Sequence, residues 1–110
     1  MQHYVNSAED IERALTAPVA LLYKHSETCP VSAMAQREID RLEHHRPDLD
    51  IWVVDVHSHR ALSREIAERF TIRHESPQAI LVREGRPVWH GSHYRVTAHA
   101  IRREVEGLGQ

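Results

Sequence analysis

The chain has 110 residues, with 14 basic and 16 acidic side chains and a formal net charge of −2. Charges of both signs are interspersed, which argues against a nucleic-acid partner or an anionic membrane surface. This length suits a single core, so residues 1–110 are predicted to form one domain.

The first elements predicted are a short helix, a strand and a longer amphipathic helix. Ser7 begins a capping-box pattern, so the first helix should start behind it. The apolar run 19–23 predicts a strand. Pro30 suits the first position of a helix, whose apolar residues repeat at helical spacing until 46–47.

The second half predicts one buried strand, a helix, a hairpin and a last helix. The run 51–56 lacks alternation, which is typical of a central strand buried on both faces. Ser58 is predicted to cap the helix that follows it. The strands 79–82 and 88–90 flank a short connection with glycine and should be antiparallel. Thr97 is predicted to cap the terminal helix.

This order of elements predicts an α/β fold of thioredoxin-like topology, with a mixed four-stranded sheet flanked by helices. Several α/β folds share parts of this order, so topology by itself does not define a function.

Cys29, the only cysteine, follows a strand and precedes Pro30, which places its sulfur at a helix N-terminus. The N–H groups of Val31 and Ser32 should then favour the thiolate, the species that attacks disulfides. We predict that Cys29 is the catalytic nucleophile and that residues 30–32 stabilise its thiolate. The alternative, a buried cysteine that acts as a small apolar residue, fits the proline and the helix start less well.

Ser32 stands where a two-cysteine oxidoreductase carries its second thiol. The motif is therefore C-x-x-S, and a mixed disulfide on Cys29 must be released by an external thiol. The bond between Ser76 and Pro77, which precedes the third strand, is predicted to be cis and to present backbone for strand-like pairing with a client.

Three separated segments, 24–32, 74–78 and 88–94, resemble the YtxJ-type monothiol bacilliredoxins. The resemblance covers nearly the whole chain. It implies a thioredoxin-like fold and an enzyme that removes bacillithiol from protein mixed disulfides, with Cys29 as the nucleophile. It also implies bacillithiol as the co-substrate thiol and bacillithiolated proteins as clients.

Bacillithiol carries carboxylates and a sugar, so cations and hydrogen-bond donors are expected around the thiol. The predicted substrate-binding residues are Lys24, His25, Thr28, Ser76, Pro77, Ser92 and His93. Lys24 and His25 suit a solvated strand end equally well. Two positions depart from the family pattern: Glu27 puts a carboxylate near the thiol, and Tyr94 replaces an expected tryptophan.

No metal is expected, because the short histidine spacings in 57–59 and 90–93 lack a second cysteine or an H-E-x-x-H helix. A lone cysteine and an N-terminus without signal features predict a cytoplasmic protein. Two other functions stay open: a thioredoxin-like module that holds an iron–sulfur cluster or a thiol without catalysis, and an inert interaction domain.

Overall fold

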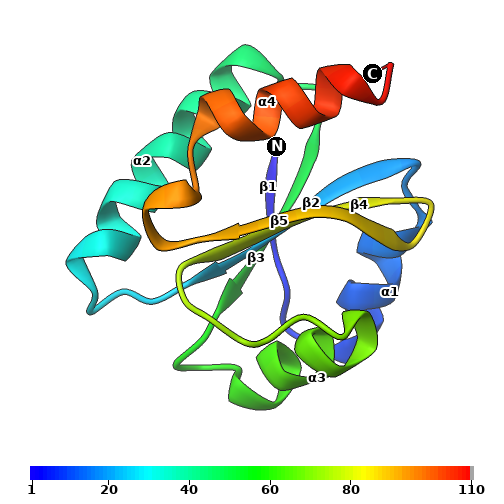
Figure 1. Ribbon diagram of the computed structural model, residues 1–110. Coiled ribbons are helices and arrows are strands. Elements are labelled where there is room, and N and C mark those ends of the chain that lie inside the picture. The colour runs from blue at the N-terminus through cyan, green and yellow to red at the C-terminus, as the bar shows by residue number, and fades with distance from the viewer. Residues whose placement is uncertain (110) are drawn as a thin grey trace.

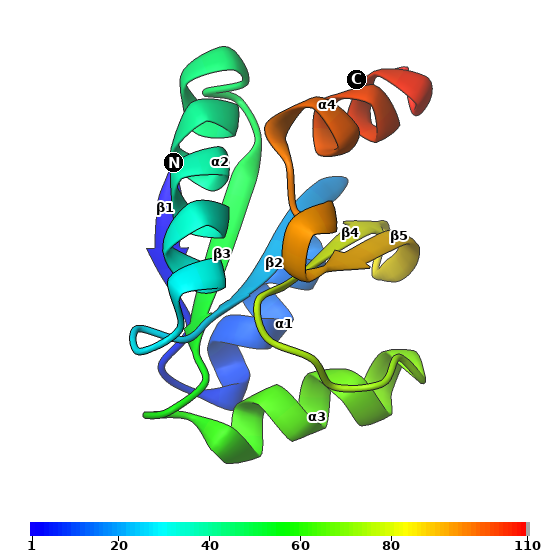
Figure 2. The same ribbon diagram turned by 60° about the vertical axis from the view of Figure 1, so that its left-hand side comes forward.

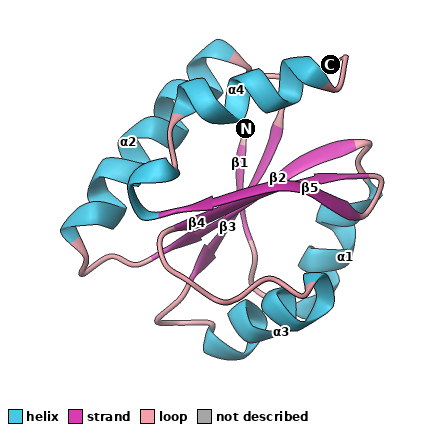
Figure 3. Cartoon of the chain, in the orientation of Figure 1, coloured by secondary structure: helices cyan, strands magenta, loops and turns pink. Residues whose placement is uncertain are grey.

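The computed structural model describes residues 1–109 and contains a five-stranded sheet with helices on both faces (Figures 1 and 3). The strands are β1 (Gln2–Tyr4), β2 (Val19–His25), β3 (Asp50–Asp55), β4 (Gln78–Arg83) and β5 (Arg86–Ser92). The helices are α1 (Ala8–Thr16), α2 (Pro30–His45), α3 (Arg60–Phe70) and α4 (Ala98–Gly107), with a short 3₁₀ helix, η1 (His93–Arg95).

The strand order is β1-β3-β2-β4-β5, in which β1, β3 and β2 are parallel and β4 and β5 are antiparallel to their neighbours. The mixed α/β sheet is confirmed, but the expected number of four strands is wrong because β1 adds an edge strand. The run 51–56 forms β3, which lies inside the sheet between β1 and β2, while β2 holds the central position.

Two layers of helices enclose the sheet, with α2 and α4 on one face and α1 and α3 on the other (Figure 2). Successive side chains of β2 point to opposite faces. Leu21 and Tyr23 therefore join the core under α2 and α4, and Leu22 joins the core under α1 and α3. Lys24 follows Leu22 on the second face.

Caps begin two helices where the sequence predicts them. The side chains of Ser7 and Thr97 accept hydrogen bonds from the N–H groups of residues three positions further on. Ser58 is not a cap, because the N-cap of α3 is His59, which makes no side-chain cap hydrogen bond. Asp55 Oδ1 accepts the N–H of His57 at 3.0 Å and of Ser58 at 3.4 Å, which folds these residues into a turn before the helix.

The β4–β5 hairpin has the predicted antiparallel pairing. Glu84 and Gly85, the two residues between the strands, both have positive φ, at 50° and 78°. Two-residue turns of this kind match the twist of paired strands. None of the helices within residues 1–109 combines the length and the apolar character needed to cross a membrane.

Candidate functional site

Cys29 lies at the point where the chain passes from the central strand into α2. It is the N-cap residue of this helix, and Pro30 occupies the first helical position. The Cys29 carbonyl accepts the N–H of Ala33 at 3.2 Å, which closes the first turn. The thiol is free and partly exposed. The predicted placement of the sulfur at a helix N-terminus is confirmed.

The first turn of α2 lowers the pKa of the Cys29 thiol below its ordinary value. The N–H of Ser32 has the largest effect and that of Val31 the next, partial burial opposes them, and the Ser32 hydroxyl adds a smaller lowering. The Cys29 side chain makes no cap hydrogen bond in the observed geometry. We therefore attribute the lower pKa to N–H groups that point towards the sulfur, not to one fixed hydrogen bond.

Buried and partly buried hydrogen bonds fix the first turn of α2 to the end of β2. Ser32 is fully buried, and its Oγ accepts the N–H of Ser26 at 3.3 Å. The Tyr23 hydroxyl lies 3.3 Å from the Ser32 carbonyl oxygen and 2.9 Å from Nδ1 of His25. Burial, followed by the charge of Asp40, raises the pKa of Tyr23, so this hydroxyl stays protonated. His25 is thus held by the strand that positions the thiol.

His57 contacts the loop that leads to Cys29, a role that the sequence analysis missed. Its Nε2 lies 2.9 Å from Ser26 Oγ and 3.1 Å from Thr28 Oγ1. The signal that points to it is topological: β2 and β3 are parallel neighbours, so the residues that follow them meet at one edge of the sheet. Thr28, a predicted binding residue, is exposed and lies at this edge.

The Ser76–Pro77 peptide bond is cis, as predicted. The Pro77 carbonyl accepts the N–H of His93 at 2.9 Å, which joins the start of β4 to η1. His93 itself has a φ of 56° and is exposed, with Nδ1 3.5 Å from Glu75 Oε2. Three predicted binding residues are therefore brought together.

A cavity of about 270 Å³ lies between α2 and η1. Its walls include Val31, Met34, His93 and Tyr94. Tyr94 is 70% exposed and Met34 is 47% exposed. The cavity therefore presents apolar and aromatic surface beside Val31, the second residue of α2. Tyr94, which replaces the expected tryptophan, keeps an aromatic ring at this wall.

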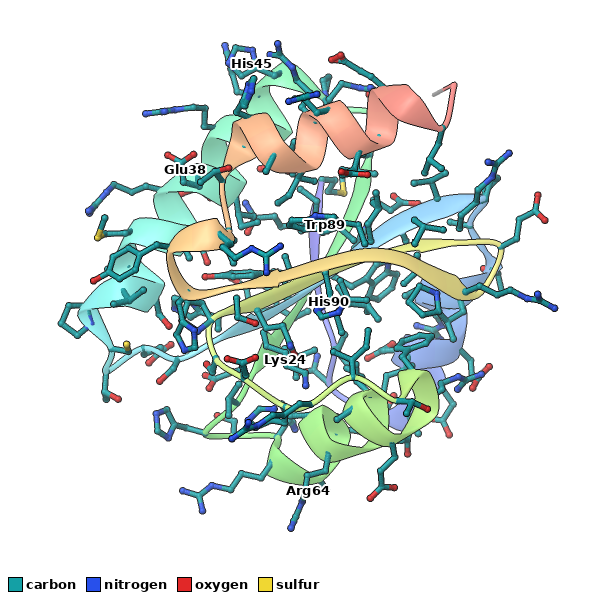
Figure 4. All side chains as sticks on the ribbon, in the orientation of Figure 1. Lys24, Glu38, His45, Arg64, Trp89 and His90 are labelled. Atoms are coloured by element: carbon teal, nitrogen blue, oxygen red, sulfur yellow. The ribbon has the colours of Figure 1, made fainter. Side chains whose placement is uncertain are left out.

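Lys24 was expected on the binding surface, and the structure contradicts this expectation. Its side chain is 0% exposed, because it points from the central strand towards the α3 side of the sheet (Figure 4). Its Nζ lies 3.0 Å from Nδ1 of His74. Burial lowers the pKa of Lys24 to about 8.

Ser92 is partly buried, and its Oγ lies 3.4 Å from Nε2 of Gln78.

Glu27 is exposed, so water screens its effect on the thiolate. Among the described residues, no group of three His, Cys, Asp or Glu side chains is arranged to hold a metal ion.

Comparison with known proteins links this site to thiol redox chemistry. A family model described as monothiol bacilliredoxin BrxC matches residues 3–101. A solved structure described as a candidate oxidoreductase with a thioredoxin fold is 30% identical, with a TM-score of 0.88, and the match covers 93% of this chain and 91% of that one.

Two thioredoxins share the fold at lower identity. A thioredoxin mutant from Halobacterium salinarum is 18% identical over 99% of this chain and 91% of that one, with a TM-score of 0.79. The thioredoxin of Trypanosoma brucei brucei is 15% identical over 98% and 90%, with a TM-score of 0.78.

Proposed function

The chain belongs to the monothiol bacilliredoxin BrxC family, and on this premise we propose that it removes bacillithiol from protein mixed disulfides. The observation that supports this proposal is the free, partly exposed Cys29 at the start of α2, whose pKa is lowered by the N–H groups of the first turn. A lower pKa increases the fraction of thiolate at neutral pH. We place this activity in the cytoplasm, where client proteins keep their thiols reduced.

The proposed reaction has two exchange steps. The Cys29 thiolate attacks the bacillithiol sulfur of a modified client, a new S–S bond forms on Cys29, and the client leaves as a thiolate that takes a proton from water. A second bacillithiol thiolate then attacks the bacillithiol sulfur on Cys29. This step releases bacillithiol disulfide and restores the Cys29 thiolate.

The neighbours of Cys29 have distinct proposed roles. Pro30 begins the helix, and the N–H groups of Val31 and Ser32 stabilise the thiolate both as nucleophile and as leaving group. Ser32 has a hydroxyl where a resolving thiol would stand, so exchange depends on the external thiol.

We assign client and co-substrate contacts to the exposed edge around the thiol. His93, next to the cavity between α2 and η1, and the backbone of Ser76 and Pro77 are the proposed contacts for the client. Thr28 and His25, on the other side of Cys29, are the proposed contacts for bacillithiol.

The test is intact mass after incubation with bacillithiol disulfide and, in parallel, with glutathione disulfide. We expect one bacillithiol adduct on the wild type, none on Cys29→Ser, and slower labelling by glutathione. The wild type, but not Cys29→Ser, should then restore a bacillithiolated client protein to its free thiol.

Failure to form an adduct with either disulfide would overturn the exchange mechanism. Visible absorbance after anaerobic purification would then favour the iron–sulfur module. Client binding without an adduct would favour the inert interaction domain.

A further inference from the structure

A second cavity, of about 370 Å³, lies under the segment that leads to Pro77, on the α3 side of the sheet. The residues that line it are Val56, His57, Arg60, Ser63, Arg64 and His74. Every polar side chain in this set offers hydrogen-bond donors, and none is a carboxylate. The wall is therefore suited to an anion.

Ser63 has no role in the fold that accounts for its hydroxyl. The residue is 1% exposed and lines the cavity, yet its Oγ has no hydrogen-bond partner. Buried hydroxyls without a partner are rare, because losing water without compensation is unfavourable. The hydroxyl is thus a donor that no group of the described fold uses, in a residue that belongs to the cavity wall.

Arg60 and Arg64 stand four residues apart on α3, where like charges repel each other. No acidic partner of either guanidinium is found within residues 1–109. Figure 4 shows Arg64 at the outer edge of α3, where it is exposed, and it is one of the residues that line the cavity. No side chain caps the N-terminus of α3. The positive end of the helix dipole is therefore not offset by a capping side chain.

His74 adds a donor whose direction is set by Lys24. The pKa of Lys24, about 8, keeps it mostly protonated at neutral pH, so its ammonium donates to Nδ1 of His74. Burial, followed by the charge of Lys24, lowers the pKa of His74, while Glu75 opposes this shift. A neutral ring that accepts at Nδ1 carries its proton on Nε2.

Asp55 and Glu75, which are close in sequence to lining residues, are engaged elsewhere. Asp55 accepts the N–H groups of His57 and Ser58, and Glu75 lies 3.5 Å from His93. Neither carboxylate lines the cavity.

His57 connects this cavity to the thiol. Its ring is part of the cavity wall, and its Nε2 lies 3.1 Å from Oγ1 of Thr28, the residue before Cys29. The cavity and the loop that leads to Cys29 thus share one side chain, that of His57.

We propose that this cavity binds the carboxylate-bearing end of the low-molecular-weight thiol that exchanges at Cys29. Arg60 and Arg64 supply the charge, the ring of His74 donates a hydrogen bond, and the Ser63 hydroxyl rotates towards the cavity to donate another. The inference rests on the proposed function, because it names the place where the co-substrate is recognised.

The experiment measures the rate of adduct formation at Cys29 with two disulfides, bacillithiol disulfide and the uncharged bis(2-hydroxyethyl) disulfide. Arg60→Gln/Arg64→Gln is compared with Arg83→Gln/Arg86→Gln, which removes the same charge at the β4–β5 hairpin. This hairpin pairs with the start of β2, whereas Cys29 follows the end of β2. Ser63→Ala is the third variant.

We expect the α3 double variant to slow the bacillithiol reaction about tenfold, the loss typical of hydrogen bonds to a charged group. Its reaction with the uncharged disulfide should be unchanged, and the hairpin variant should match the wild type with both. Ser63→Ala should slow only the bacillithiol reaction, by about threefold to tenfold. Malate, a dicarboxylate without a thiol, should shift the His74 ring resonances and compete with bacillithiol disulfide.

Equal rates for wild type and α3 variant with bacillithiol disulfide would overturn the inference and leave the proposed function intact. A response of His74 to inorganic phosphate but not to malate would also overturn it, since the site would then be one for free phosphate. Failure of the wild type to react with either disulfide would instead count against the proposed function.

Discussion

Nζ of Lys24 lies 3.0 Å from Nδ1 of His74, which joins the end of the central strand to the segment that leads into Pro77. Lys24 is the only lysine of the chain, since the other basic side chains are arginine. An arginine could not lose its charge here, whereas a buried lysine can. The pair thus places a titratable ammonium inside the fold.

Lys24→Met should remove a rise of stability at alkaline pH. Burial lowers the pKa of Lys24 to about 8 in the folded state, from 10.5 in the unfolded chain. Between these values the unfolded state binds more protons, so the free energy of unfolding of the wild type should increase with pH, by about 3 kcal/mol. Urea unfolding between pH 8 and pH 10.5 measures this increase. Plots of stability against pH that run parallel for the wild type and Lys24→Met would contradict the prediction.

The Cys29 thiol should titrate below the ordinary thiol pKa of about 8.5. The backbone N–H groups have the largest effects and the Ser32 hydroxyl a small one, so Ser32→Ala should raise the pKa only slightly. Ultraviolet absorbance of the thiolate measures both values.

The same shift sets a pH dependence of stability. The stabilisation of the thiolate is fully present above the unfolded pKa and is lost as pH falls through the folded value. The free energy of unfolding of the wild type, relative to that of Cys29→Ser, should therefore decrease as pH falls through the folded pKa. A normal thiol pKa in the wild type would refute the helix effect.

Ser32→Cys should convert the monothiol site into a dithiol site. Residues three apart on a helix are close enough for a disulfide, and the Ser32 hydroxyl already acts on the Cys29 thiol. A bacillithiol adduct on Cys29 should then be displaced by the new thiol, leaving an internal disulfide. Intact mass distinguishes the two products, and a persistent adduct would show that the second sulfur cannot reach the first.

Gly91→Ala should destabilise the fold by about 1–3 kcal/mol, the usual penalty of overpacking. A Cβ at Gly91 would lie 2.8 Å from Cζ2 and 2.9 Å from Cη2 of Trp89, so the indole must move. Urea unfolding and tryptophan fluorescence should both change. Gly107→Ala is the matched control, because nothing lies within 4 Å of its added Cβ, and it should not lower stability.

Features that depend on neighbours in the sequence were predictable. The start of α2 at Pro30, the cap at Thr97 and the β4–β5 hairpin follow from local chemistry, and the structure has all three. The edge strand β1 was missed because it has only three residues, no apolar alternation and a partner, β3, far along the chain.

The candidate site also combines features that depend on neighbours in the sequence with features that depend on distant partners. The N–H groups that lower the pKa of Cys29 belong to its own helix, so their effect was foreseen. Burial of Lys24 depends on the face that β2 presents to α3, and the contact of His57 with Thr28 depends on the pairing of β2 with β3. The spacing of residues along the chain predicts neither the burial of Lys24 nor the contact of His57.

The buried Lys24 leaves these 110 residues with no side-chain amine at the surface. Amine-reactive dyes and surface-coupling reagents should therefore modify the folded chain at its α-amino group alone. Each molecule would carry one tag at one defined end, and a second tag on Lys24 would mark molecules that had unfolded during labelling.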